Sequence, residues 1–564
     1  MSRAASTAPG NPFASSRRVT TPGCAPRSHR SLPGGTRERP ANRLFGGFLA
    51  ALLLALSLSP HAATDADADA EAEAGVEAAR ATDIPEPLLI ETRHQGRFGG
   101  TSVRYTARVA EMHLTNDANE PVAAMFYTAY MLENAGRDRP VSFVFNGGPG
   151  SASVWLHMGL LGPQRVIVPS EADADDGAAP YRVIDNPDTL LDRTDLVFID
   201  PIGTGFSRVI GAGDTKDFWS MQGDAASIAQ FIRRFVTEHG RWNAPKYLIG
   251  ESFGTTRAAL VADALMGGGQ NLALNGIVMV SQAMDYTGST PVADNLLAYV
   301  TYLPTMAATA HYHGRAGAGQ PLEAFVDAAR AFAVDEYLPA LFRGSALDEA
   351  ERRSIAERHA AFTGLEPAYV LRANLRVTVG RFTKELLRDE GRVVGRLDSR
   401  YTAEEGDDTA DSPRLGDAAS NAISSAYTAA FNDHLSRRLG LTPTRPYLTS
   451  NGNVGRNWNY RPVPEGSSWE PSYVNTSRAL SAALRRNSDL RVLVANGYYD
   501  LVTPFFDAQY TLGRHEILRD RITMIYYGAG HMMYTREADF DALMDDIRGF
   551  YTAAAPGTAS AASD

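Results

Sequence analysis

A series of short apolar runs, separated by segments with helical spacing, most constrains what this chain can fold into. The runs lie at residues 141–145, 195–199, 247–249, 277–280, 490–496 and 522–527. Continuous apolar runs of this length are typical of strands buried on both faces. The clearest helix between them stops at Gly240 and has one apolar face, formed by Ile228, Phe231, Ile232, Phe235 and Val236. Strands that alternate with helices predict an α/β fold with a mostly parallel central sheet.

Two regions depart from this alternation. Between Val103 and Leu132, two runs of alternating polarity flank the turn-like "TNDANEP" and predict antiparallel strands at the edge of the sheet. Between Asp285 and Thr476 there are helical pieces, at 322–333 and 417–439, but no series of parallel strands. We interpret this second region as a large, mainly helical cap inserted over the sheet.

These boundaries predict a core interrupted by one insertion. The first part of the core covers residues 84–285, the cap insertion residues 286–475, and the second part of the core residues 476–554. We expect the tail, residues 555–564, to be disordered.

The N-terminal segment, residues 1–63, is predicted to be a secretory signal peptide with a long basic leader. It carries eight arginines and one acid, Glu38, and contains the apolar stretch 44–58 followed by small residues near Ala63. A start downstream of Met1 and a retained membrane anchor remain alternatives. Residues 64–83 are acidic and alanine-rich and are predicted to be a linker. We expect the protein to be exported, either periplasmic or secreted.

Charge and cysteine content exclude several classes of function. Removal of residues 1–63 changes the formal charge from −11 to −18, which disfavours binding to nucleic acid or to an anionic membrane. The single cysteine, Cys24, lies in the leader. The mature chain therefore has no disulfide, no thiolate nucleophile and no cysteine metal ligand, and the sequence indicates neither a metal nor a cofactor.

The sequence "GESFG", residues 250–254, lies between a short apolar strand and a helix that ends at Gly267. This is the context of a nucleophile elbow, in which a sharp turn exposes a serine and small residues let strand and helix approach closely. Ser252 is the candidate nucleophile. The alternative is an ordinary serine in a glycine-rich turn.

A serine nucleophile needs a histidine as base and a carboxylate to orient that histidine. Asp500 and His531 each follow one of the last two apolar runs, in the chain order serine, acid, histidine. Separately, Asp500 could be a turn residue and His531 a core histidine. His515 is the nearest competitor as base, but "LGRHEIL" has the pattern of a helix.

The glycine-rich "NGGPG", residues 146–150, directly follows the run at 141–145. Attack on a carbonyl creates an oxyanion, which backbone amides stabilise, and one such amide belongs to the residue after the nucleophile, here Phe253. A glycine-rich loop can supply the second amide without side chains in the way.

Together these motifs resemble those of the serine carboxypeptidase family of α/β-hydrolases. The matching segments keep the family's order and are "NGGPGSAS" (146–153) with "GP" (162–163), "DLVFIDPIGTGFS" (195–207), "GESFG" (250–254), "NGYYD" (496–500) and "GAGHM" (528–532). The resemblance implies a triad of Ser252, Asp500 and His531, and an oxyanion hole of the Gly148 and Phe253 amides. It also implies that Asn146, the Gly147 amide and Glu251 bind the free C-terminal carboxylate of a peptide substrate.

Two positions depart from the family pattern. Ser151 stands where many members have cysteine, and Leu160 stands where the family usually has a glutamate that pairs with the elbow glutamate. The resemblance predicts a serine-type carboxypeptidase. An esterase, an acyltransferase or another peptidase on the same scaffold remains an alternative, as does a catalytically silent binding protein.

Overall fold

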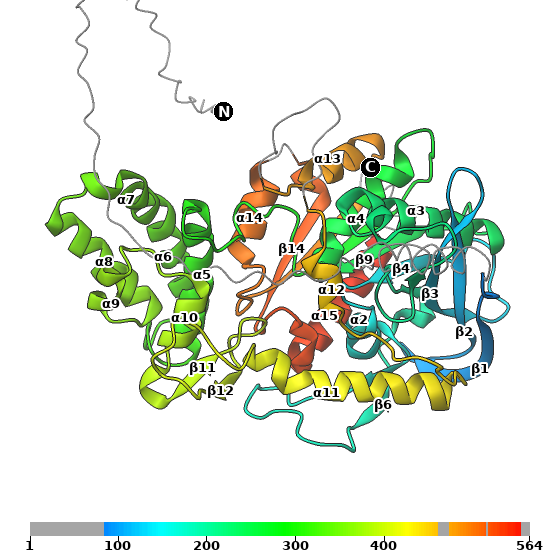
Figure 1. Ribbon diagram of the computed structural model, residues 1–564, viewed down its shortest axis with the longest axis horizontal. Coiled ribbons are helices and arrows are strands. Elements are labelled where there is room, and N and C mark those ends of the chain that lie inside the picture. Colours follow the sequence, from blue (N-terminus) through cyan, green and yellow to red (C-terminus); the bar gives the residue numbers. More distant parts are fainter. Residues whose placement is uncertain (1–83, 461–472, 515–516, 554–564) are drawn as a thin grey trace, which may run out of the picture. The chain divides into compact units, whose positions relative to one another are not determined.

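The computed structural model describes residues 84–460, 473–514 and 517–553 (Figure 1). The predicted signal peptide, linker and C-terminal tail lie outside these residues. The described residues begin at Ile84, the first residue of the predicted core. Within them, a ten-stranded sheet has the order β1-β2-β3-β7-β4-β9-β10-β13-β14, and β8 pairs with β3. Its strands are β1 (Leu89–Phe98), β2 (Thr101–Thr115), β3 (Pro121–Leu132), β4 (Val141–Phe145), β7 (Asp195–Ile199), β8 (Arg208–Val209), β9 (Lys246–Glu251), β10 (Gly276–Val280), β13 (Arg491–Gly497) and β14 (Ile522–Tyr527).

The strands from β7 to β14 are mutually parallel, as the apolar runs predict. Successive side chains of a strand point to opposite faces of a sheet. In β4, Val144 therefore packs in one core cluster while Phe143 and Phe145 pack in the other. Both faces of β4, β7 and β10 are buried, which explains why these strands are continuously apolar.

The opposite end of the sheet is antiparallel. β1 pairs with β2, β2 with β3, and β3 with β7 in antiparallel register. The prediction of antiparallel edge strands is confirmed, but the sequence analysis missed β1. Residues of β1 alternate between exposed and half-buried positions, so this outer strand contributes only Phe98 to the buried core.

Helices cover both faces of the sheet, as Figure 1 shows. Residues of α3 (Met221–Glu238), α4 (Phe253–Met266) and α13 (Ser477–Arg486) pack in one cluster. Residues of α15 (Glu537–Ala553) pack in the other, together with α2 (Val154–Leu156) and the π-helical turn His157–Leu161. The helix α14 (Phe505–Arg514) follows β13. The result is the predicted α/β architecture.

A mainly helical insertion occupies the chain between β10 and α13. Its helices are α5 (Leu296–Tyr312), α6 (Leu322–Phe332), α7 (Leu338–Arg343), α8 (Glu349–Thr363), α9 (Pro367–Arg372), α10 (Val379–Glu385), α11 (Ala418–Asp433) and α12 (Gly452–Arg456). A small hairpin joins β11 (Arg392–Val394) to β12 (Thr402–Glu404), and another two-stranded sheet, outside the insertion, joins β5 (Gln164–Val166) to β6 (Val183–Asp185). Helices α5 and α7–α10 share a hydrophobic core of their own, whereas α11 packs into the core beneath the sheet.

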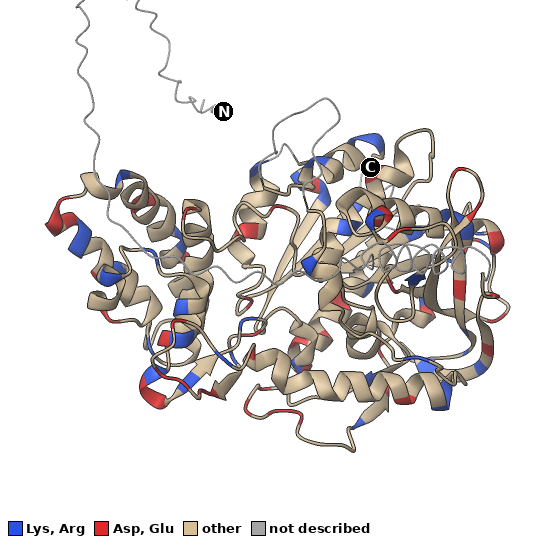
Figure 2. Cartoon of the chain, in the orientation of Figure 1, with Lys and Arg blue, Asp and Glu red and all other residues tan. Residues whose placement is uncertain are grey.

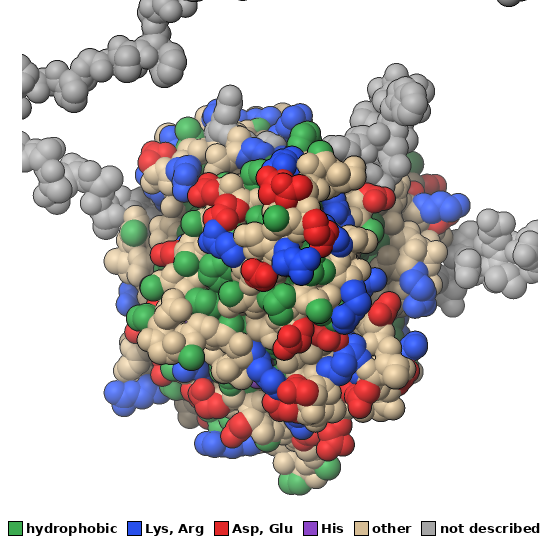
Figure 3. Space-filling model, turned by 90° about the vertical axis from the view of Figure 1, so that its left-hand side faces the viewer, with side chains coloured by type: hydrophobic (Ala, Val, Ile, Leu, Met, Phe, Trp, Pro, Cys, Tyr) green, Lys and Arg blue, Asp and Glu red, His purple; other side chains and the backbone are tan. Residues whose placement is uncertain are grey.

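The surface carries charges of both signs. Figure 2 shows acidic and basic positions interspersed along the helices of the insertion, and Figure 3 shows hydrophobic side chains separated by charged ones on that face. None of the helices in the described residues is both long enough and apolar enough to cross a lipid bilayer.

Candidate active site

Ser252 occupies the turn between β9 and α4. Its backbone has φ 59° and ψ −129°, a conformation that non-glycine residues rarely adopt. The Ser252 amide donates to the Val280 carbonyl of β10 at 2.9 Å, and its carbonyl accepts from the Thr255 amide at 2.8 Å. These bonds hold the strained turn, and Ser252 lines a pocket at the carboxyl end of the sheet.

Glycines make this turn possible. A Cβ on Gly250 would lie 2.3 Å from the Gly254 carbonyl oxygen, and a Cβ on Gly147 would lie 2.5 Å from the Phe253 nitrogen. Strand, helix and the loop after β4 therefore approach more closely than any side chain would allow. This is the geometry of a nucleophile elbow in an α/β-hydrolase fold.

Asp500 and His531 meet at the ends of β13 and β14. Asp500 Oδ2 lies 2.7 Å from His531 Nδ1, and both side chains are buried. Asp500 Oδ1 accepts from the Val502 and Thr503 amides at 2.8 and 3.0 Å, and Oδ2 also accepts from Thr503 Oγ1 at 2.7 Å. The carboxylate is thus fixed in the position that orients the imidazole through Nδ1.

The surroundings of His531 raise its pKa and fix its backbone, as a role as general base requires. Burial is the largest influence and lowers the pKa of His531, but the charge and hydrogen bond of Asp500, together with the charge of Glu251, raise this pKa above its ordinary value. The carbonyl of His531 accepts from Ser281 Oγ at 2.6 Å, and its amide donates to Leu397 at 2.6 Å. His531 and Ser252 line the same pocket, which has a volume of about 470 Å³.

The two segments predicted to form the oxyanion hole lie side by side. Gly147 abuts the Phe253 amide, and Gly148 lines the pocket. Among the described residues, neither the Gly148 nor the Phe253 amide takes part in an intramolecular hydrogen bond. Both amides are therefore available to an oxygen of a ligand.

Asn146 and Glu251 form a buried hydrogen-bonded pair beside this loop. Asn146 Oδ1 accepts from the Leu156 amide at 3.0 Å, which leaves Nδ2 to donate to Glu251 Oε1 at 2.9 Å. Glu251 Oε2 accepts from the Tyr534 hydroxyl at 2.5 Å. Burial raises the pKa of Glu251 to about 7, although His531 and these two hydrogen bonds oppose the rise.

Leu160 stands at the position of the family's second glutamate but cannot form a hydrogen bond with Glu251. It is fully buried in the π-helical turn and packs in the same hydrophobic cluster as Tyr534. The second hydrogen-bond partner of Glu251 is Tyr534, which the sequence analysis missed. Its place three residues after His531 is a signal that could have identified it.

Arg257 is a second residue that the sequence analysis missed. Its Nε donates to Asp224 at 2.6 Å, and its Nη1 donates to the Asn146 carbonyl. The guanidinium also lies between the rings of Phe145 and Phe253, about 5.5 and 5.3 Å from their centres. Arg257 thus ties the loop after β4 to the helix that follows Ser252.

Two histidines of the insertion, His311 and His313, do not line this pocket. His311 Nε2 bonds to the Gln320 carbonyl at 2.8 Å, and His313 Nε2 bonds to the Ser399 carbonyl at 2.7 Å. His515, the alternative base, lies outside the described residues, just after α14.

Part of the chain is similar in sequence to known proteins. Residues 113–312 match the family model described as serine carboxypeptidase. The chain is similar to the serine carboxypeptidase family over this segment. It is 32% identical over 158 residues to a pheromone-processing carboxypeptidase, KEX1, of Cryptococcus gattii, and 26% identical over 172 residues to serine carboxypeptidase-like 51 of Arabidopsis thaliana.

These matches to the two curated family members cover only parts of the proteins. They include 27% and 28% of this chain, and 22% and 34% of the two relatives. Among solved structures, KEX1Δp, a prohormone-processing carboxypeptidase from Saccharomyces cerevisiae, aligns over 79% of this chain and 92% of its own, with 15% identity and a TM-score of 0.49.

Proposed function

We propose that this protein is a serine-type carboxypeptidase that hydrolyses the C-terminal peptide bond of peptides through an acyl-enzyme. The observation that carries the proposal is the 2.7 Å contact between Asp500 and His531 in a pocket that also contains Ser252 and Glu251. This arrangement offers a nucleophile and an oriented base beside a group suited to a carboxylate.

Acylation begins with the Ser252 hydroxyl. His531 accepts its proton as Oγ attacks the scissile carbonyl, and Asp500 stabilises the resulting imidazolium through Nδ1. The Gly148 and Phe253 amides receive the oxyanion of the tetrahedral intermediate. His531 then protonates the leaving amine, and the C-terminal amino acid departs.

Deacylation repeats these steps with water. His531 removes a proton from a water molecule, which attacks the acyl-enzyme, and then returns a proton to Ser252 Oγ. The shortened peptide leaves with a new C-terminal carboxylate and can bind again.

Selection of the chain end rests on Asn146, the Gly147 amide and Glu251. Asn146 Nδ2 has a second hydrogen that its bond to Glu251 does not use. With its pKa raised to about 7, Glu251 is protonated in a substantial share of molecules at neutral pH. A protonated Glu251 can donate to the carboxylate of the substrate, whereas an ionised one would repel it.

Two measurements test the proposal. A fluorophosphonate probe should label Ser252, which would distinguish an enzyme from a silent binding protein. Release of the C-terminal residue from a free-acid peptide, but not from its amidated form, would distinguish a carboxypeptidase from an esterase or another peptidase. Equal cleavage of both forms would contradict the carboxypeptidase proposal and favour the alternatives on this scaffold.

The proposed cellular setting follows from the sequence. We propose that the protein acts outside the cytoplasm, in the periplasm or as a secreted enzyme, on peptide substrates. The measurement is the N-terminal sequence and fractionation of the mature protein, and an intact residue 1–63 segment in a cytoplasmic fraction would contradict it.

A further inference from the structure

One arginine of the insertion, Arg396, lines the same pocket as Ser252 and His531. Its side chain is exposed. Many arginines of the insertion pair with carboxylates, as Arg315 does with Asp389 at 2.7 Å and Arg343 with Glu351 at 2.6 Å. In the part of the chain that the structure describes, no carboxylate forms an ion pair with the guanidinium of Arg396.

The other charges of the pocket do not neutralise Arg396. Asp417 lines the same pocket, but its carboxylate caps α11 and accepts from the Arg396 and Leu397 amides at 2.6 and 3.2 Å. It also accepts from Ser420 Oγ at 3.1 Å. These donors and the helix N-terminus already satisfy Asp417. Arg396 thus brings to the pocket a positive charge that has no bonded counterion among the residues the structure describes.

The backbone of Arg396 is fixed to the catalytic loops. Its carbonyl accepts from the Leu501 amide at 3.0 Å, one residue after Asp500. The next carbonyl, that of Leu397, accepts from the His531 amide at 2.6 Å. The arginine therefore enters the pocket from the side of Asp500 and His531, whereas Asn146 and Glu251 enter it from the ends of β4 and β9.

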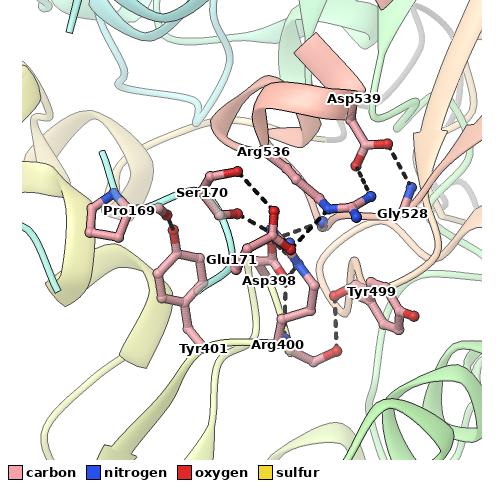
Figure 4. A network of polar contacts seen from close by, with 12 residues as sticks. Pro169, Ser170, Glu171, Asp398, Arg400, Tyr401, Tyr499, Gly528, Arg536 and Asp539 are labelled. Carbon is pink, nitrogen blue, oxygen red and sulfur yellow. Dashed lines mark hydrogen bonds and ion pairs between the residues drawn. The ribbon is translucent and has the colours of Figure 1, made fainter. Parts of the chain in front are cut away.

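A buried polar network holds the segment that follows. Asp398 pairs with Arg400 at 2.7 Å, and the side chains of both are almost fully buried. Asp398 Oδ2 also accepts from the Gly530 amide at 2.9 Å. Figure 4 shows this pair beside Tyr499 and Arg536, with Tyr401 bonded to the Pro169 carbonyl. Because the backbone of this segment is anchored, only the side chain of Arg396 has to be ordered on binding.

We propose that Arg396 binds a side-chain carboxylate of the substrate, so that the enzyme prefers peptides with Asp or Glu next to the scissile bond. This inference rests on the proposed carboxypeptidase function. A guanidinium that forms charge-assisted hydrogen bonds discriminates a carboxylate from the isosteric amide. The positive charge of Arg396 thus forms a subsite for an anion, here called the anionic subsite, opposite the group that selects the chain end.

The test compares peptides that differ only at the two positions flanking the scissile bond, with Glu, Gln or Lys at each. We expect the wild type to hydrolyse the better Glu peptide about tenfold more efficiently than its Gln counterpart, as measured by kcat/KM. Arg396→Gln should bring this ratio to about one, and Arg396→Glu should favour the Lys peptide. The matched control is Arg414→Gln, which removes the same charge from an exposed site of the insertion and should keep the ratio of the wild type.

A binding measurement separates this proposal from the proposed function. In a Ser252→Ala background, the Glu peptide should bind about tenfold more tightly than the Gln peptide, and Arg396→Gln should abolish the difference. If the Gln peptide is cleaved but the Glu-to-Gln ratio is one, or if Arg396→Gln leaves the ratio unchanged, the anionic subsite is wrong and the carboxypeptidase stands. If no peptide is cleaved but the binding difference depends on Arg396, the subsite stands and the carboxypeptidase does not.

Two further results would overturn the assignment. If Arg396→Gln instead removes the discrimination between free and amidated C-termini, Arg396 binds the terminal carboxylate and the side-chain subsite is wrong. If no peptide binds to Ser252→Ala, both proposals fail.

Discussion

The hydroxyl of Tyr534 donates to Oε2 of Glu251 at 2.5 Å, while Asn146 donates to the other carboxyl oxygen. Both donors stabilise the ionised form of Glu251, and burial, which is the larger effect, favours the protonated form. The balance raises the pKa of Glu251 to about 7. A carboxyl group with this pKa changes its charge near neutral pH, where a peptide carboxylate is always ionised.

The first prediction concerns the pH dependence of KM. For a free-acid peptide, KM should increase as the pH rises through about 7, because Glu251 ionises and repels the substrate carboxylate. The same peptide with an amidated C-terminus should show little such dependence, and Glu251→Gln should flatten the free-acid profile. Equal profiles of the two peptides in the wild type would rule out this mode of recognition.

The second prediction is that Tyr534→Phe moves this profile to higher pH. The phenol lowers the pKa of Glu251 by donating to the carboxylate, so its removal should raise that pKa. The inflection of KM for the free-acid peptide should therefore shift upward. A matched control is Tyr527→Phe, which removes a hydroxyl bonded to Asp546 at 2.7 Å, away from Glu251. A downward shift in Tyr534→Phe would contradict the assigned role.

The third prediction concerns the triad. Ser252→Ala should reduce kcat at least about a thousandfold, and Asp500→Asn and His531→Ala should do the same. Circular dichroism and thermal unfolding should show that Ser252→Ala keeps the fold. His515→Ala should keep its activity, because the pocket contains His531. An active Ser252→Ala variant, or an inactive His515→Ala variant beside an active His531→Ala variant, would reverse these assignments.

The pH profile of kcat/KM offers a further check on His531. Because Asp500 raises the pKa of His531 above its ordinary value, the rate should increase with pH until the imidazole is neutral. Asp500→Asn removes this stabilisation of the imidazolium. The residual activity of Asp500→Asn should therefore reach its plateau at lower pH than the wild type.

The fourth prediction concerns Arg257, which joins Asp224 to the Asn146 carbonyl inside the protein. The side chains of Arg257 and Asp224 are 0% and 4% exposed. Arg257→Ala would leave the Asp224 carboxyl group buried without its counterion, which typically costs about 3–5 kcal/mol of the free energy of unfolding. Urea denaturation measures this loss. In the exposed pair Arg343–Glu351, Arg343→Ala should cost much less, because solvent screens both charges.

The sequence predicts those features that depend on neighbours along the chain. Runs of apolar residues identify β4, β7 and β14 to the residue. The strands β4 and β7 are buried on both faces, and β14 is the half-buried edge strand. The elbow and the two loops that carry Asp500 and His531 follow from their positions after strands. The roles of Tyr534 and Arg257 depend instead on contacts with residues 283 and 111 positions away, and no local pattern specifies such contacts. Arg396 faces the pocket for the same reason, because bonds to Leu501 and Asp417 place its backbone.

The last prediction concerns acid stability and two buried histidines, His157 and His434, that take no part in the proposed mechanism. His434 Nδ1 lies 2.9 Å from Gln164 Oε1, and its Nε2 lies 2.7 Å from the Tyr130 hydroxyl, which is also 2.7 Å from His157 Nε2. All three hydrogen bonds have a donor and an acceptor when His157 donates to Tyr130, Tyr130 donates to His434, and His434 donates to Gln164. Both imidazoles are then neutral.

Burial lowers the pKa of His434 to about 3 and holds that of His157 well below its ordinary value. The unfolded chain binds a proton at each histidine below a pH of about 6.5, whereas the folded protein does not. The free energy of unfolding is therefore highest above that pH. It should fall by about 1.4 kcal/mol per pH unit for each histidine as the pH decreases toward the folded pKa.

Urea denaturation at pH 7 and pH 5 measures this dependence. His434→Gln should reduce the loss of stability between the two pH values, since one titrating group is removed. Tyr130→Phe is the matched control, because it removes the shared hydroxyl but leaves both histidines buried. It should lower stability at both pH values and keep the pH dependence of the wild type. An unchanged dependence in His434→Gln would show that this histidine does not titrate between the folded and unfolded states in that range.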